Sequence, residues 1–219
     1  MTTDEHRKDR RELARTNDPK LSRWPRTDRR RHRVETVLNR RQPDLTVVLE
    51  NVHDPHNVSA VLRTCDAVGI LRVHVVYSVE TPPESAFART TSASAAKWID
   101  VTRHEHIDAC YAALRNDGFT IAAAALSDRS VDLFALDLVQ PTAIVFGNEM
   151  RGLSEEATAL ADTTMVIPMM GMVQSLNISV ACAVTLYEAL RQRMLNGDYQ
   201  SPKLAQSELP GLVEEWLRR

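Results

Sequence analysis

Short runs rich in Val, Ile and Ala alternate with helix-like segments along this chain, and this alternation constrains the fold more than any other feature. The runs predicted as buried strands are 45–50, 72–77, 119–126, 142–147 and 164–169. The segments predicted as helices are 56–68, 105–118, 154–161 and 177–193. Strands that alternate with helices form a mainly parallel sheet flanked by helices, so we predict an α/β fold.

Two of the predicted helices have informative faces. Segment 56–68 carries one apolar stripe, which consists of Val58, Val61, Leu62, Cys65 and Val68. Segment 177–193 is apolar on nearly every side as far as Tyr187, so we expect it to pack against the sheet and against a partner as well. Ser154, followed by two acids, is predicted to cap the helix 154–161.

The formal net charge of −2 conceals an uneven distribution. Residues 1–41 contain 14 Lys and Arg against seven Asp and Glu, whereas residues 42–219 contain 13 against 22. A basic arm on an acidic body is typical of proteins that bind nucleic acid, but a solvated basic tail explains the same composition.

The three cysteines and the hydropathy pattern bear on the cellular compartment. Cys65, Cys110 and Cys182 lack CxxC spacing, so we interpret them as reduced, buried side chains. No apolar run approaches the roughly 20 residues that a membrane span needs, and no secretory signal is visible. We therefore expect a cytoplasmic protein that does not insert into a membrane.

The stretch "LENVHDPHNVSAVLRTCDAVG" (49–69) has more polar side chains at its turn than a helix cap requires. His56 and Arg63 are seven residues apart and so share one helix face, while Asn57 lies at the helix start. Free N–H groups at a helix N-terminus together with a guanidinium favour phosphate. A capped helix with one solvated Arg is the alternative.

Two later segments also interrupt the strand and helix pattern. "FGNEMRGLS" (146–154) contains two of only seven glycines, which indicates backbone with positive φ or close approach to another group; a plain tight turn is the alternative. In "IPMMGMVQSLNISVA" (167–181), Ser175 and Asn177 enter an apolar run and must be satisfied by capping or by a polar ligand. All three segments follow predicted strands, and open α/β sheets bind ligands at the carboxyl ends of their strands.

The stretches "NVHDPHNVSAVLRTCDAVG", "IVFGNEMRGLSEEA" and "IPMMGMVQSLNISVACAVTLYEALRQR" resemble the three motifs of the SpoU branch of SPOUT RNA methyltransferases. The resemblance is closest to the TrmH type, and it covers the chain from about residue 29 to the C-terminus. It implies a methyltransferase domain over 29–195, with an N-terminal helix at 30–41 and a deep trefoil knot over roughly 142–190. The remaining parts are a basic extension at 1–28 and a tail with a short helix at 196–219.

The activity that the resemblance implies is methyl transfer from S-adenosylmethionine to the ribose 2′-OH of a guanosine in tRNA, at D-loop position 18. It implies a homodimer, and no metal is required because a sulfonium methyl is already activated. The implied catalytic residues are Arg63, Asn57, Glu149, Ser175 and Asn177. The implied cofactor-binding residues are Ala124, Leu126, Gly147, Ile167, Met172 and Leu176.

Charge supplies the candidates for RNA binding, which are Arg33, Arg41, His56, Arg115, Arg191 and Arg193. For Arg63, whose guanidinium stays protonated, we favour a clamp on the RNA phosphate over direct proton abstraction. Glu149 is expected to hold its loop by accepting backbone N–H bonds. Three other functions stay open: a ribosomal RNA methyltransferase, a catalytically silent RNA-binding protein and a small-molecule α/β enzyme.

Overall fold

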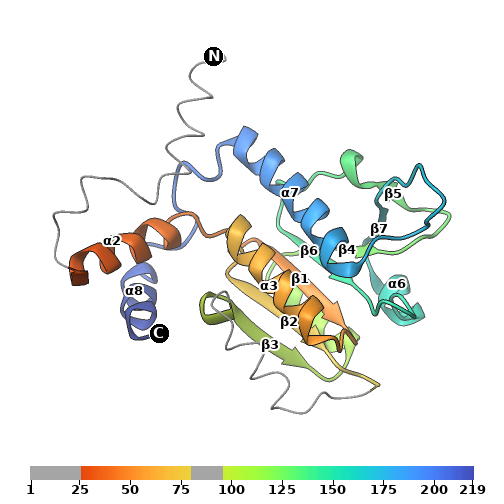
Figure 1. The fold of residues 1–219 in the computed structure, drawn as a ribbon, viewed down its shortest axis with the longest axis horizontal. Helices are drawn as coiled ribbons and strands as arrows, with labels where there is room; N and C mark the ends of the chain where they lie inside the picture. The colour runs from red at the N-terminus through yellow and green to blue at the C-terminus, as the bar shows by residue number, and fades with distance from the viewer. Residues whose placement is uncertain (1–25, 80–95) are drawn as a thin grey trace. The chain divides into compact units, whose positions relative to one another are not determined.

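The computed structural model describes residues 26–79 and 96–219, and most of the predicted extension 1–28 lies outside these ranges (Figure 1). Contacts divide the chain into two units, one of residues 40–204 and one that joins residues up to Asn39 with 205–219. This division differs from the predicted boundaries at 28/29 and 195/196, because the first described helix and the last one pack on each other. None of the helices in the described ranges is long and apolar enough to cross a membrane.

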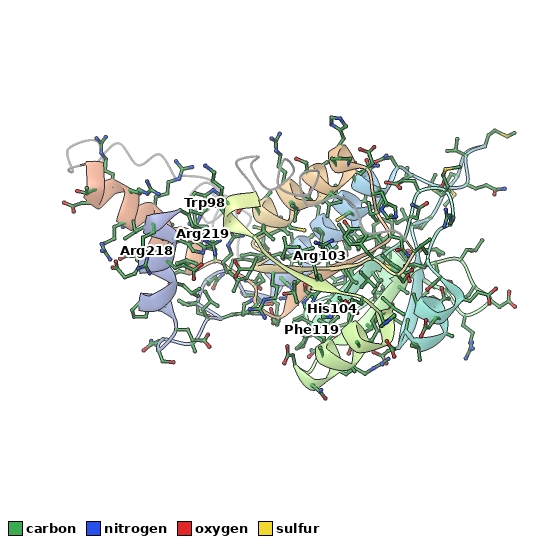
Figure 2. All side chains as sticks on the ribbon, turned by 90° about the horizontal axis from the view of Figure 1, so that it is seen from below. Trp98, Arg103, His104, Phe119, Arg218 and Arg219 are labelled. Atoms are coloured by element: carbon green, nitrogen blue, oxygen red, sulfur yellow. The ribbon has the colours of Figure 1, made fainter. Side chains whose placement is uncertain are left out.

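The smaller unit contains α2 (Arg26–Leu38) and α8 (Leu209–Arg218). Val34 and Leu38 of α2 are buried, as are Val213 and Trp216 of α8. Apolar stripes on two short helices bury each other, which explains why these segments from opposite ends of the chain pair. Arg31 and Glu214 add an exposed ion pair at 2.8 Å, and Arg218 and Arg219 lie at the end of α8 (Figure 2).

Within the described residues, seven strands of the larger unit form one sheet in the order β3-β2-β1-β6-β4-β7-β5, and all pairs are parallel. The strands are β1 (Leu45–Glu50), β2 (Arg72–Val76), β3 (Asp100–His104), β4 (Thr120–Ala124), β5 (Val131–Asp132), β6 (Thr142–Phe146) and β7 (Thr163–Val166). The predicted parallel α/β sheet is therefore confirmed. The edge strands β3 and β5 were not predicted, because β3 consists mostly of polar residues and β5 has only two residues.

Helices cover both faces of this sheet. They are α3 (Pro55–Val68), α5 (Ile107–Asn116), α6 (Glu155–Leu160) and α7 (Ile178–Asn196), with short 3-10 turns η2 (Ala96–Trp98) and η3 (Leu133–Ala135). Helices α3 and α7 pack side by side over one face (Figure 1), while α5 and α6 pack together with the other core cluster. Alternate residues of a strand point to opposite faces, so Val47 and Leu49 join the first cluster and Val48 the second.

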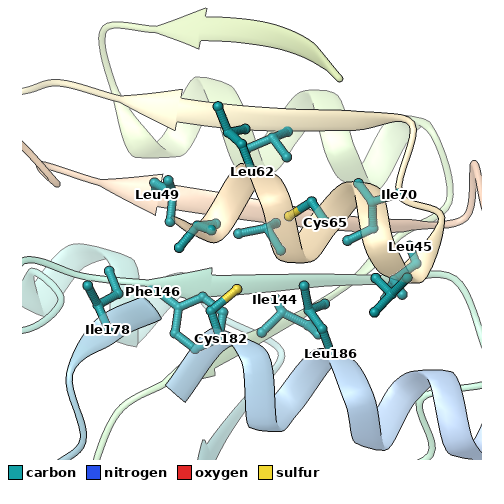
Figure 3. Close-up of a cluster of buried hydrophobic side chains, with 14 of the residues drawn as sticks. Leu45, Leu49, Leu62, Cys65, Ile70, Ile144, Phe146, Ile178, Cys182 and Leu186 are labelled. Atoms are coloured by element: carbon teal, nitrogen blue, oxygen red, sulfur yellow. The ribbon is translucent and has the colours of Figure 1, made fainter. Parts of the chain in front are cut away.

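The core between α3, α7 and the sheet follows the predicted apolar stripe (Figure 3). The buried residues of α3 are the five that the sequence indicated, from Val58 to Val68. From α7 the buried apolar residues are Ile178, Cys182, Leu186 and Ala189. All three cysteines are free and buried, and burial, together with Cys182, raises the pKa of the Cys65 thiol.

Two arginines that were predicted to bind RNA are instead buried in ion pairs. The Arg193 side chain is 0% exposed, and it forms an ion pair with Asp44 and donates to the carbonyls of Leu138 and Gln140 at 2.9 and 3.0 Å. Burial raises the pKa of Asp44, but Lys203 and Arg193 outweigh this effect and hold it below its usual value. The prediction that Arg193 binds RNA is wrong, because its buried guanidinium forms an ion pair with Asp44.

Arg41 plays the same part beside the neighbouring strands. Its guanidinium is fully buried, pairs with Asp66, and donates to the Ile70 carbonyl at 2.8 Å and the Trp98 carbonyl at 3.3 Å. These carbonyls come just before β2 and β3, as Asp44 and Gln140 come just before β1 and β6. Both arginines therefore join the N-terminal ends of the strands, and the RNA-binding prediction is wrong for Arg41 as well.

Candidate functional site

The three segments that the sequence singled out follow neighbouring strands of the sheet. Residues 51–54 follow β1, residues 147–154 follow β6 and residues 167–177 follow β7. The strands β1, β6, β4 and β7 are adjacent, and residues 125–130 follow β4. Because these strands are parallel, all four connections leave the same edge of the sheet, where open α/β sheets bind ligands.

A chain of side-chain hydrogen bonds connects three of the predicted catalytic residues. The Asn57 Nδ2 donates to Glu149 Oε1 at 2.6 Å, and the Asn177 Nδ2 donates to Asn57 Oδ1 at 3.2 Å. Asn57 lies on α3, Glu149 on the loop after β6 and Asn177 at the start of α7. Each amide both donates and accepts, so the relative positions of the three segments are fixed by directed bonds.

Helix caps at the starts of α3 and α7 position the side chains that form these hydrogen bonds. Asp54, not Asn57, caps α3, since its carboxylate accepts from the His56 N–H at 2.8 Å, and Pro55 occupies the first turn. Asn177 caps α7 by accepting from the Ser179 N–H at 2.9 Å, which is one of the two alternatives that the sequence left open. Because Asp54 satisfies the start of α3, the Asn57 side chain is available to bond Glu149.

The loop after β6 is a tight turn held by its asparagine. The Asn148 Oδ1 accepts from the backbone N–H groups of Met150 and Arg151 at 2.9 and 3.2 Å. Its Nδ2 donates to the carbonyl of Asn51, a residue with φ of 53°, at 2.9 Å. Glu149 was expected to accept hydrogen bonds from the backbone of this loop. In the structure Asn148 accepts them, and Glu149 accepts from the Asn57 side chain instead.

The two glycines of this loop are required for different physical reasons. Gly152 has φ of 70°, a conformation that glycine adopts at little cost. At Gly147 a Cβ would overlap the backbone of Gly152 and Leu153. The sequence therefore indicated both needs correctly, since one glycine allows positive φ and the other allows close approach of two backbone segments.

Glu50, which the sequence did not single out, secures the same loop. It is 2% exposed at the end of β1, and its carboxylate accepts from the Ser154 N–H at 2.8 Å and the Ser154 Oγ at 2.6 Å. The Ser154 Oγ also accepts from the Ala157 N–H at 3.0 Å, so it caps α6 as predicted. A glutamate that ends an otherwise apolar strand was the available signal for this contact.

The loop after β7 is exposed and apolar. Met170, Met172 and Val173 are 94%, 99% and 64% exposed. Within the described chain, the backbone N–H groups of residues 169–176 donate no hydrogen bond to protein groups. Ile167 and Leu176 are half-buried at the ends of this loop. Ser175 is exposed, and among the described residues it forms no hydrogen bond with Asn57 or its two partners.

The remaining predicted cofactor-binding residues come from β4 and the loop after it. Ala124 is the last residue of β4 and is half-buried against the core cluster. Leu126 is 89% exposed. Apolar side chains and unused N–H groups thus occur together at this edge of the sheet, a combination that suits an organic ligand with polar groups.

Arg63 and His56 lie on the exposed side of α3, two turns apart on the same face. Arg63 has no hydrogen bond or ion pair with any described residue, so its guanidinium is available to a ligand. This contrasts with the buried arginines of the opposite edge, which are fully engaged in protein contacts.

The other predicted RNA-binding residues differ in their surroundings. Arg33 is exposed on α2. Arg115 lies in the last turn of α5, where it pairs with Asp162 at 2.9 Å. It lies towards the N-terminal edge of the sheet, because β4 starts at Thr120, shortly after this helix. Arg191 is half-exposed and pairs with Glu188 at 2.7 Å.

The chain is similar in sequence to known proteins. The model of the SpoU rRNA Methylase family matches residues 44–187. The chain is 49% identical to a tRNA (guanosine(18)-2′-O)-methyltransferase of Thermus thermophilus over 194 residues, which cover 89% of this chain and 98% of that protein.

Two solved structures extend the comparison. The crystal structure of the A. aeolicus TrmH/SpoU tRNA modifying enzyme matches with a TM-score of 0.77 and 37% identity, over 88% of this chain and 96% of that one. An AdoMet-bound rRNA methyltransferase from Sinorhizobium meliloti matches with a TM-score of 0.60 and 29% identity, over 72% and 59%. With its parallel sheet, its three connected loops and these relatives, the chain belongs to the SpoU methylase family.

Proposed function

We propose that this protein transfers a methyl group from S-adenosylmethionine to the ribose 2′-OH of a guanosine in tRNA, at D-loop position 18. The observation that carries the proposal is the Glu149–Asn57–Asn177 hydrogen-bond chain, with Asn57 in the middle, together with an exposed Arg63 on the same helix as Asn57 that has no partner among the described residues. The relative from Thermus thermophilus, similar over 98% of its own length, is named for this reaction.

The residues at the carboxyl edge fit the methyl donor. Ala124, Leu126, Ile167, Met172 and Leu176 supply apolar surface, and residues 169–176 supply N–H groups without acceptors in the described chain. Gly147 lets two backbone segments approach closely beside them. S-adenosylmethionine, when bound there, supplies an activated methyl group, so we expect the reaction to need no metal.

The side chains around it have separate tasks in this proposal. A ribose 2′-OH is a weak nucleophile, so its transfer reaction depends on orientation and on help with the proton. Arg63 clamps the RNA phosphate beside the target ribose and so holds it where it can accept the proton of the 2′-OH. Asn57 orients the ribose, Glu149 and Asn177 hold Asn57, and Ser175 shapes the loop between donor and acceptor.

The direct test is label transfer from S-adenosylmethionine to purified tRNA and to ribosomal RNA, followed by mapping of the methylated nucleotide. We expect label in tRNA at a single 2′-O-methylguanosine of the D-loop. Label in ribosomal RNA alone would favour the ribosomal alternative. No label in either RNA, from protein that binds tRNA, would favour a silent RNA-binding protein.

Substitution of Gly147 by alanine is expected to weaken binding of S-adenosylmethionine, because the new Cβ must displace the backbone at Gly152 and Leu153. Overpacking of this kind costs about 1–3 kcal/mol, which corresponds to roughly 5- to 150-fold in affinity if the strain falls on the binding loop. Calorimetric titration measures the change. Gly171→Ala, where no atom lies within 4 Å of the new Cβ, is the matched control, and an equal loss there would contradict the argument.

We propose that tRNA affinity comes in part from exposed cationic side chains, with Arg33, His56, Arg115 and Arg191 as the candidates that remain. Arg33→Ala is expected to lower the slope of log affinity against log salt concentration by about 0.7–0.9, the value for one phosphate contact. Arg33→Lys keeps the charge and serves as the control. Filter binding over a salt series measures both, and a slope unchanged in Arg33→Ala would remove this residue from the RNA surface.

We also propose that residues 142–190 form a deep trefoil knot. The proposal is supported by the family membership and by the meeting of the loops after β6 and β7 at one edge. Refolding from denaturant is expected to be slow relative to unknotted α/β domains of this size, because the chain end must thread before the native contacts form.

The exposed apolar surface supports a homodimer. Val180, Tyr187 and Leu195 of α7 are 46%, 54% and 62% exposed, and Met172 and Val173 add further apolar area. Exposed apolar area of this kind is typical of protein interfaces. Light scattering at micromolar concentration is expected to give the mass of two chains, and the mass of one chain would contradict the proposal. A cytoplasmic location stays a prediction.

A further inference from the structure

Three potential metal ligands meet on the face of the sheet that α5 covers. One ligand atom from each of His74, His104 and Cys110 lies within 4.8 Å of the others. His74 is on β2, His104 ends β3 and Cys110 is in the first turns of α5. In Figure 2, His104 lies at the end of β3 near α5. The sheet register and the packing of α5 bring the three side chains together.

The cluster of His74, His104 and Cys110 is largely shielded from solvent. Cys110 is fully buried among Ile107, Tyr111 and Leu114, and His74 is 8% exposed. Two imidazoles and a thiol are side chains that zinc accepts as ligands.

The spacing of the two histidine nitrogens is close to that of a tetrahedral site. His74 Nδ1 and His104 Nε2 form a hydrogen bond at 2.9 Å, and the two rings stack with centroids 5.2 Å apart. Zinc takes nitrogen at about 2.1 Å and sulfur at about 2.3 Å, which places tetrahedral ligand atoms roughly 3.3–3.6 Å from one another. The two histidines need to separate by only about half an ångström to reach this spacing. His104 is partly exposed, so a water molecule can reach the fourth position.

We propose that His74, His104 and Cys110 bind one borderline-soft divalent cation of the zinc type, outside the methyl-transfer site. Binding replaces the proton of the Cys110 thiol, which leaves to solvent, and the proton of the His74–His104 hydrogen bond, which moves to the other nitrogen of its ring. Two metal–nitrogen bonds and one metal–sulfur bond form. The site lies at β3 and β2, at the opposite end of the strand order from β7. Its role is structural, since the cation links the edge strand β3 to its neighbour β2 and to α5.

Cobalt provides the sharpest test, because a thiolate bound to Co²⁺ gives a charge-transfer absorption band that histidine ligands alone do not give. The full-length protein, freed of metal with a chelator, is titrated with Co²⁺ and then with Zn²⁺. We expect a band that saturates at one equivalent per chain and that Zn²⁺ abolishes by displacement. We also expect Zn²⁺ to raise the midpoint of thermal unfolding, since it binds only the folded chain.

Matched variants assign the ligands. Cys110→Ala is expected to lose the band, and Cys182→Ala, which removes another buried thiol, to keep it. His104→Gln is expected to lose tight Co²⁺ binding, while His106→Gln, an exposed histidine two residues away, retains it. Circular dichroism and methyl transfer to tRNA establish that His104→Gln is folded, since its side chain is partly exposed. No band in the full-length protein, or a band that survives Cys110→Ala, would overturn the proposal.

Discussion

Replacement of Arg63 by alanine is expected to reduce methyl transfer to tRNA by at least about 100- to 1000-fold, the range for loss of one well-placed charged or polar group in a transition state. Arg63 is exposed on α3 and has no partner among the described residues, so its removal leaves the loops after β6 and β7 intact. Binding of S-adenosylmethionine is therefore expected to survive. Single-turnover methylation and calorimetry measure the two effects separately.

Two controls sharpen the Arg63 experiment. Arg63→Lys keeps a positive charge but not the planar pair of donors, so partial activity is expected if the residue holds a phosphate. Arg72→Ala removes an exposed arginine at the start of β2, at the opposite edge of the sheet, and is expected to retain activity. Full activity in Arg63→Ala would contradict the proposed role.

Replacement of Arg193 by leucine is expected to lower the free energy of unfolding by about 3–5 kcal/mol, the range for removal of one partner from a buried ion pair. Arg193 is 0% exposed, and its loss leaves Asp44 with Lys203 as its remaining cationic partner among the described residues. It also removes the guanidinium donor of the Leu138 carbonyl and one of the two donors of the Gln140 carbonyl, which keeps the Thr142 hydroxyl. Urea unfolding followed by circular dichroism measures the loss as a lower midpoint.

Arg191→Leu on the same helix is the matched control. Arg191 is half-exposed and pairs with Glu188, three residues away, and exposed ion pairs contribute about 0–1 kcal/mol. We therefore expect a small change in unfolding free energy. Equal losses in the two variants would show that the buried network around Arg193 is not what stabilises this edge.

Local patterns were sufficient for most of the sheet and for part of the site. The apolar stripe of α3 and the cap at Ser154 were predicted correctly, because each depends on residues within one or two helical turns, and capping by Asn177 was one of two alternatives. The glycines at 147 and 152 were also interpreted correctly, since positive φ and close approach leave few other residues possible. The motif resemblance then supplied the family, which the relatives confirm.

The errors have one physical cause. Arg41 and Arg193 were assigned to the RNA surface because charge in a sequence says nothing of burial. The partners that neutralise them, Asp66 and Asp44, lie 25 and 149 residues away along the chain. Glu149 was given backbone partners for the same reason, since its actual donor, Asn57, is 92 residues distant.

Sequence alone specified the order of the helices and of every strand except β3 and β5 in the larger unit, the apolar faces and the three motifs, because these depend on neighbours within a few residues. Tertiary structure decided which charges are buried, which amides join Asn57 to Glu149 and Asn177, and how His74, His104 and Cys110 come together. The physical reason is that such contacts depend on the order and register of parallel strands. That order is set by the packing of the whole sheet and not by any single segment.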